Sequence, residues 1–122
     1  MNGKKKGIGF IFAFQGFKHA LLYERNFQLQ VLSGLLVVIV SFALNLSPIE
    51  WAMIVLVIGS VLSLEIINSA VERLLDYVKP EIHPQAKIIK DMLASAVLII
   101  SFVALLIGLI ILSPKLTSLL IK

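Results

Sequence analysis

The sequence predicts an all-α membrane protein of one domain, residues 1–122, in which an N-terminal amphipathic surface helix precedes three transmembrane helices. The first observation is composition, because 59% hydrophobic and 15% charged residues make the chain far more apolar than a soluble domain. The second is that three apolar runs each approach the roughly 20 residues that cross a bilayer. Three such helices enclose little volume, so a homo-oligomeric helical bundle is expected.

The surface helix is predicted over residues 7–25, where apolar side chains recur at helical spacing among polar ones. The recurring apolar residues are Phe10, Phe14, Phe17 and Leu21. A signal peptide is the alternative, with the lysines at 4–6 as its charged start, but Gln15 and Lys18 interrupt its apolar run. No small-residue cleavage site follows, so the surface helix is favoured.

The membrane helices are predicted over residues 29–46, 49–76 and 88–112. A tight turn at Asn45, Ser47 and Pro48 joins the first two, and Pro48 is well placed to open the second. A polar loop from Tyr77 to Lys90 is expected before the third helix, because its prolines end the preceding one. The small residues expected to pack against other copies of the chain are Ser33, Gly34, Ser60, Ser69 and Gly108.

Basic residues predict the orientation in the membrane. Lys and Arg gather before the first membrane helix and around the polar loop, and the positive-inside rule assigns both regions to the cytoplasm. The C-terminus is then outside. The net charge is +4, but the basic residues flank the apolar runs and do not form an exposed basic stripe. No nucleic-acid partner is therefore expected.

A polar stripe enters the second membrane helix from its cytoplasmic end. Glu65, Asn68, Glu72 and Asp76 follow one another at steps of three and four, so they fall within about 80° of one another on one helix face. An ionisable residue inside an apolar run is costly, which makes function the default hypothesis for Glu65. The plainer alternative is that the other three are contacts between helices or a solvated helix end.

Glu24, at the end of the surface helix, is a candidate metal ligand. If that helix folds back toward the second span, Glu24 and Glu72 supply two carboxylates to one Mg²⁺ bound with phosphates. Lys90 and Asp91 open the third helix at the same level, where a cation can meet phosphate, although an interfacial anchor with a cap is the alternative. No Gly-rich phosphate loop is present, so an ATP site must be built from helix surfaces.

Two segments carry a specific resemblance. Residues 65–72 read EIINSAVE, and residues 90–92 read KDM with SAVL at 95–98. With Gly16, Glu24 and Phe27 ahead of them, the whole chain resembles the small bacterial diacylglycerol kinase and undecaprenol kinase family. The resemblance implies a homotrimer in the bacterial inner (cytoplasmic) membrane, with active sites between subunits at the cytoplasmic surface.

The resemblance also implies roles for individual residues. Glu65 is expected to be the catalytic base, and Glu24 and Glu72 are expected to hold the metal. Beside these implied roles, we expect Asn68 to orient the base or the hydroxyl. The residues implied in nucleotide binding are Lys5, Phe12, Glu24, Glu72, Asp76, Glu81, Ile82, His83, Lys90 and Asp91. Those implied in binding the lipid are Phe14, Gly16, Lys18, Phe27 and Glu65.

The expected function is transfer of the γ-phosphate of ATP to the hydroxyl of a membrane lipid alcohol, with Mg²⁺ as cofactor. Diacylglycerol, which gives phosphatidic acid, is the expected lipid, and undecaprenol is the alternative. A non-enzymatic transporter or channel, with Glu65 as its coupling carboxylate, is a more remote alternative. A catalytically silent assembly subunit is the third.

Overall fold

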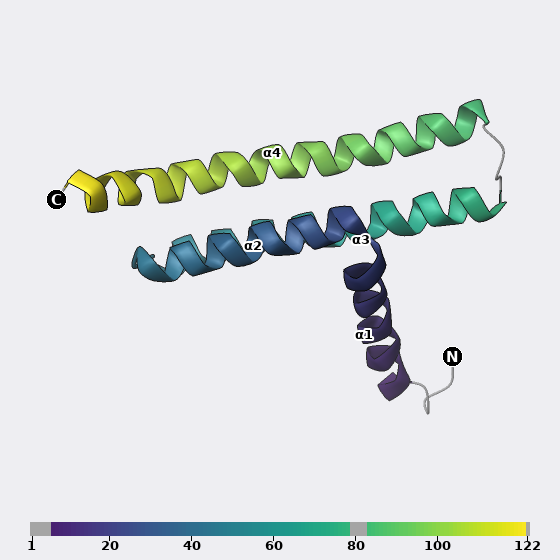
Figure 1. Cartoon of the computed structure of the whole chain (residues 1–122), viewed down its shortest axis with the longest axis horizontal. Coiled ribbons are helices and arrows are strands. Elements are labelled where there is room, and N and C mark those ends of the chain that lie inside the picture. Colours follow the sequence, from purple (N-terminus) through teal and green to yellow (C-terminus); the bar gives the residue numbers. More distant parts are fainter. Residues whose placement is uncertain (1–5, 79–82, 122) are drawn as a thin grey trace.

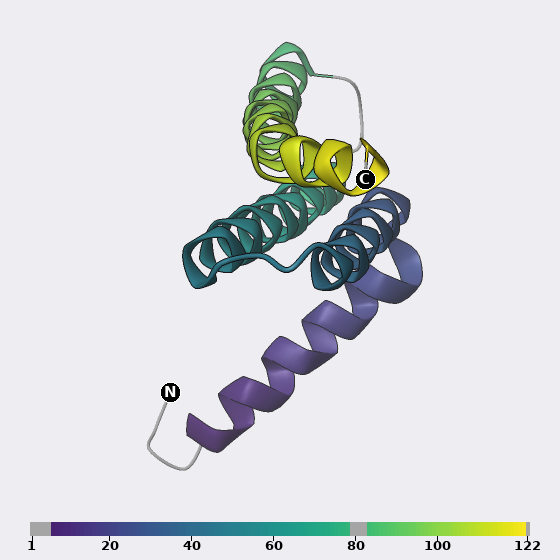
Figure 2. The same cartoon turned by 90° about the vertical axis from the view of Figure 1, so that its left-hand side faces the viewer.

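The computed structural model describes residues 6–78 and 83–121, and all regular structure in these ranges is α-helical. The helices are α1 (Lys6–Tyr23), α2 (Arg25–Ala43), α3 (Pro48–Val78) and α4 (Pro84–Ile121). The last three run along the long axis of the molecule, whereas α1 is steeply inclined to them and extends away (Figure 1, Figure 2). These three are long and apolar enough to cross a membrane, which confirms the predicted all-α class and its three apolar helices.

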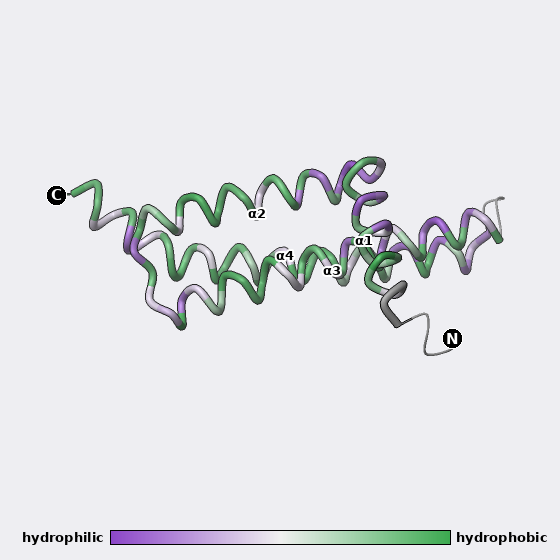
Figure 3. The backbone as a smooth tube through the Cα atoms, turned by 90° about the horizontal axis from the view of Figure 1, so that it is seen from below, coloured by the Kyte–Doolittle hydropathy of each residue, from purple (hydrophilic) through white to green (hydrophobic). Residues whose placement is uncertain are grey.

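The helices differ in length, so α3 and α4 extend beyond α2 and form a projecting end of the bundle that is called the polar end below. With 19 residues α2 is about 28 Å long, close to the hydrocarbon thickness of a bilayer. With 31 and 38 residues, α3 and α4 reach about 46 Å and 57 Å, so both exceed that thickness. The end of α3 and the start of α4 project together past the start of α2 (Figure 1). Hydrophilic residues gather there and where α1 meets α2 (Figure 3).

The predicted tight turn between α2 and α3 is confirmed. Asn45 has a left-handed backbone with φ of 56°, which asparagine tolerates better than most residues. The Ser47 N–H donates to Glu50 Oε1 at 2.9 Å, and the Glu50 N–H donates to Ser47 Oγ at 3.2 Å. This reciprocal capping box begins α3, with Pro48 as its first residue as expected.

The apolar core lies at the turn end of the bundle. Leu44, Leu46, Ile54 and Ile111 form its buried cluster, with Trp51 among the half-buried residues packed against it. This cluster fastens the α2–α3 hairpin to α4, which packs chiefly on α3.

Gly34 packs inside the subunit, so its assignment to contacts between copies of the chain was wrong. It is buried, and a Cβ at this position would lie 3.1 Å from Ile58 Cγ2 on α3. The absent side chain therefore lets α2 approach α3 closely. Gly59 differs, because a Cβ there would meet nothing within 4 Å.

The predicted polar loop is shorter than expected, because residues 84–90 are helical. Pro84 opens α4, where its fixed φ suits a first helical position. His83 caps this helix: its Nδ1 accepts from the Gln85 N–H at 3.1 Å, and its carbonyl accepts from the Lys87 N–H at 3.1 Å. At its other end α4 continues through Pro114 to Ile121, beyond the predicted limit of 112.

The N-terminal helix is present, and its described aromatic side chains are exposed. Phe12 and Phe14 are 56% and 73% exposed. Two residues apart, they lie about 200° from each other around the helix, so a single apolar stripe is not shown.

Candidate active site

The buried face of α3 changes from apolar to polar along its length. Its buried residues are Ile54, Val57, Val61, Glu65 and Asn68, at steps of three and four. The side chain positions of Glu65 and Asn68 continue the packed face toward the polar end, and these two residues are only 3% and 7% exposed. Because buried positions recur every three or four residues along the helix, the Glu65 carboxyl group lies inside the bundle, where the apolar part of α3 meets its polar end.

Two oxygen atoms on this face lack partners. Within the described ranges, neither Glu65 Oε1 nor Asn68 Oδ1 accepts a hydrogen bond, although both are buried. An unpaired buried polar atom costs about 1–3 kcal/mol, and more for a charged group. Asn68 Nδ2 donates a long bond of 3.5 Å to Glu72 Oε1, which links the stripe to the next turn. A ligand proton or cation would satisfy these two buried acceptor atoms.

Glu24 occupies the corner between α1 and α2 and reaches α3. Its backbone is extended, with φ of −106° and ψ of 107°, which interrupts the helix there. Its side chain caps neither helix; instead Oε1 accepts from Arg73 Nη2 at 2.9 Å. Arg73 directly follows Glu72 on α3, so this contact places the Glu24 side chain at the same end of α3. The fold therefore brings the corner carboxylate to the acidic stripe.

Gln28 and a pair of aromatic rings hold this corner. Gln28 Nε2 donates to the carbonyls of Leu21 at 2.9 Å and Leu22 at 3.2 Å, which satisfies acceptors at the end of α1. The rings of Phe17 and Phe27 meet edge to face at 5.4 Å. Phe27 is fully buried, so in the single chain it anchors α1 to α2 and presents no free surface to the lipid that it was expected to bind.

Within the described residues one ion pair joins the projecting ends of α3 and α4, and a second lies within α4. Lys90 Nζ lies 2.8 Å from Asp76 Oδ1, which brings together two of the residues expected at the nucleotide. Asp91 instead pairs with Lys87 on its own helix, at 2.7 Å. His83 is exposed at the cap of α4 with its Nδ1 already engaged.

The remaining predicted site residues are more scattered. Phe12, Phe14, Gly16 and Lys18 lie on α1, all exposed, and a Cβ at Gly16 would meet nothing within 4 Å. Lys5, Glu81 and Ile82 lie outside the described residues. The described part of a single chain therefore brings Glu24 to α3 and Lys90 to Asp76 but does not enclose a nucleotide.

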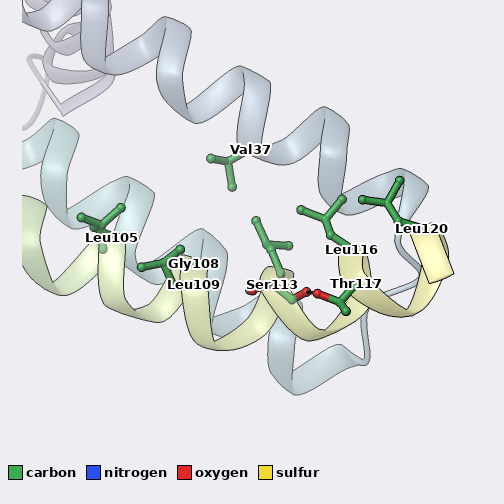
Figure 4. A pocket seen from close by; sticks show the side chains of 10 residues that line it. Val37, Leu105, Gly108, Leu109, Ser113, Leu116, Thr117 and Leu120 are labelled. Carbon is green, nitrogen blue, oxygen red and sulfur yellow. Dashed lines mark hydrogen bonds between the residues drawn. The ribbon is translucent and has the colours of Figure 1, made fainter.

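An apolar hollow of about 420 Å³ lies between α2 and α4, away from this site. Val37 faces it from α2, and Gly108, Leu109 and Leu116 line it from α4 (Figure 4). Its lining contains no titratable side chain, so it supplies no acid or base for chemistry. The acidic end of α3 remains the candidate site.

From the sequence, Arg73 and Lys87 predicted only the orientation in the membrane. Both pair with acids of the predicted site, Glu24 and Asp91. The Lys87 to Asp91 spacing of four residues is a readable helical signal. The Arg73 to Glu24 pairing spans 49 residues, and no local pattern indicates it.

The fold and the site define a small integral-membrane protein with an acidic site at the polar end of a helical bundle. Residues 11–112 match the prokaryotic diacylglycerol kinase family. The chain belongs to this family and is therefore a lipid kinase.

Named relatives agree with this membership. The chain is 40% identical over 107 residues to an undecaprenol kinase of Bacillus subtilis, covering 88% of this chain and 87% of that protein. It is 34% identical over 115 residues to a diacylglycerol kinase of Synechocystis, covering 93% of this chain but 66% of that longer protein. A diacylglycerol kinase of Pseudomonas aeruginosa is 37% identical over 97 residues, or 80% of this chain and 70% of that protein. The resemblance inferred from the motifs is confirmed.

Proposed function

We propose that this lipid kinase transfers the γ-phosphoryl group of ATP to the hydroxyl of a membrane lipid alcohol at the polar end of α3. The observation that carries the proposal is the buried Glu65 carboxyl group, with an unpaired oxygen, at the boundary of the apolar bundle. A lipid hydroxyl reaches such a boundary from the bilayer, whereas a nucleotide reaches it from the projecting polar ends. Kinase family membership removes the transporter or channel alternative.

Glu65 acts as the general base in this proposal. Its carboxylate accepts the hydroxyl proton as the lipid oxygen bonds to the γ-phosphorus, and the bond from that phosphorus to the bridging oxygen breaks with its electrons leaving on ADP. Asn68, one turn further along the same face, holds the base or the hydroxyl in line. Lys90 offsets negative charge on the phosphates.

Glu24 and Glu72 are the residues that would hold Mg²⁺. Within the described residues no cage of three or more acidic or histidine ligands is formed. Mg²⁺ bound with ATP needs no such cage, because it uses one or two carboxylates beside phosphate oxygens and water. Glu72 accepts only the long bond from Asn68 Nδ2 within the described ranges, so its carboxylate keeps acceptor positions for a cation and the two carboxylates fit the ion. When bound, Mg²⁺ neutralises phosphate charge.

Undecaprenol now ranks ahead of diacylglycerol as the proposed lipid. The Bacillus subtilis undecaprenol kinase matches with higher identity, and over more of its own length, than the diacylglycerol kinases of Synechocystis and Pseudomonas aeruginosa. Diacylglycerol stays as the second candidate because those relatives carry that name.

A lipid phosphorylation assay tests the proposal. Purified protein in lipid vesicles is given radiolabelled ATP and Mg²⁺ with undecaprenol or with diacylglycerol, and we expect labelled undecaprenyl phosphate to form faster. Preferential labelling of diacylglycerol would reverse the order of the two lipids. Absence of labelling with both would support a silent assembly subunit instead.

The proposed location is the inner membrane, with the N-terminus, α1 on the membrane surface, and the active site all on the cytoplasmic side. Arg73, Lys87 and Lys90 lie at the polar end, as the positive-inside rule requires of a cytoplasmic face. The same assay in sealed inside-out vesicles tests the orientation. We expect turnover when ATP is added outside the inside-out vesicles. Turnover only with right-side-out vesicles would reverse the proposed orientation.

The proposed assembly is a homotrimer with shared active sites. Most large apolar side chains of the described helices are exposed in the single chain, and Leu98 and Ile110 on α4 are both 70% exposed. Lipid and neighbouring copies together cover such faces in a membrane. Native mass spectrometry in mild detergent is expected to give a trimer, and a monomer at all protein concentrations would contradict it.

A further inference from the structure

Arg73 is an exposed guanidinium at the edge of the acidic site. Its Nη2 lies 2.9 Å from Glu24 Oε1, and the two side chains are 61% and 26% exposed. Among the side-chain hydrogen bonds of residues 6–78 and 83–121, this bond alone joins the α1–α2 corner to α3. The guanidinium thus holds the corner carboxylate where the stripe of α3 reaches the polar end.

The pairing differs between the two candidate metal ligands. Glu24 is neutralised by Arg73, whereas Glu72 accepts only the long bond from the Asn68 amide in the described part of the chain. A divalent cation that binds Glu24 therefore competes with the guanidinium for the same carboxylate. Exposed ion pairs are worth up to about 1 kcal/mol, so a cation can break this one at little cost.

A guanidinium released from its carboxylate needs another anion. Arginine remains protonated in proteins, and its planar fork matches phosphate oxygens with two parallel hydrogen bonds. The anion that arrives with the cation is the polyphosphate of the nucleotide.

We propose that Arg73 is a positioning residue that changes partner, holding Glu24 before the metal nucleotide binds and binding its phosphates afterwards. This inference rests on the proposed function. It assigns Arg73 two opposite effects, because the side chain opposes binding of a bare cation and favours binding of the cation with its nucleotide.

The variant Arg73→Gln tests both effects on purified protein in detergent. Mn²⁺ alone, followed by electron paramagnetic resonance without nucleotide or turnover, is expected to bind about two- to fivefold more tightly, because the competing charge is gone. The KM for Mg-ATP in the lipid assay is expected to rise about tenfold, the loss typical of a charged hydrogen bond, with kcat little changed. If the substitution instead damaged the fold, the affinities for Mn²⁺ and for Mg-ATP would both fall.

Two further variants sharpen this test. Arg73→Lys keeps the charge but not the fork, so Mn²⁺ affinity should match wild type while the KM for Mg-ATP still rises. Arg25→Gln is the matched control, since Arg25 adjoins Glu24, is exposed, and forms no ion pair within the described ranges. It should leave both measurements within about twofold of wild type.

The outcomes separate this inference from the proposed function. If the wild type phosphorylates neither lipid, the proposed function fails, and the Mn²⁺ measurement still reports on the competition. If the wild type is active but Arg73→Gln behaves as Arg25→Gln does, or weakens Mn²⁺ and Mg-ATP binding together, the exchange of partners is wrong.

Discussion

Replacing Glu65 by Gln is expected to lower kcat at least about 100-fold, because the variant keeps the size and hydrogen-bonding capacity of the side chain but loses the proton acceptor. The half-saturating concentrations of Mg²⁺ and ATP should change little, since the residue acts on the lipid hydroxyl and not on the metal. Steady-state kinetics of lipid phosphorylation, with each of the two concentrations varied in turn, measures both quantities.

A second measurement separates lost chemistry from lost structure. Glu65 is buried with an unpaired oxygen, so the Glu65→Gln variant, which removes the charge, should unfold at a higher temperature in detergent than the wild type. Active-site residues commonly lower stability in this way. A variant that is inactive because it is misfolded would unfold at a lower temperature. Near-normal turnover of a well-folded Glu65→Gln variant would falsify the assignment of the base.

The second large effect is expected from Glu24→Gln and Glu72→Gln, each of which removes one negative charge from the proposed cation site. Each variant should raise the Mg²⁺ concentration for half-maximal activity about tenfold or more, comparable with one lost charged contact. Nucleotide binding should require more Mg²⁺ by a similar factor. Mg²⁺ titrations of turnover and of binding of a fluorescent ATP analogue measure the two shifts.

Glu50→Gln is the matched control for these variants. Glu50 lies at the opposite end of α3, paired with Lys115 at 3.3 Å, and glutamine can replace it in the capping box with Ser47. Its Mg²⁺ dependence should equal that of the wild type. If the Glu24 and Glu72 variants also retain wild-type Mg²⁺ dependence, the metal lies elsewhere, at Asp76 or Asp91.

Local patterns in the sequence were enough to predict the all-α class, the three apolar helices and the turn before Pro48. They also placed Glu65, Asn68 and Glu72 on one helix face, and the structure shows that the first two are buried. These properties are readable because a bilayer requires long apolar runs and a helix repeats every 3.6 residues, so both depend only on neighbouring residues.

Local patterns failed where one segment meets another. The loop before α4 was predicted too long because Pro84 was interpreted as a helix breaker, whereas with His83 as cap it begins the helix. Gly34 was assigned to contacts between subunits, although it fits against Ile58 of the same chain. In both cases the residue type is compatible with two structural roles, and the contacts in the folded chain decide which role it has.

The sequence by itself therefore determined the membrane helices, the acidic stripe on α3 and, through its motifs, membership of the diacylglycerol kinase family. Only the tertiary structure decided that the α1–α2 corner returns to α3 and that Arg73 holds Glu24 there. Lipid can cover the apolar side chains of each helix separately, so the pattern of apolar residues does not specify how the helices are arranged. The pairing of side chains 49 residues apart depends instead on the break at Glu24 and on the packing of Phe17, Phe27 and Gln28 around it.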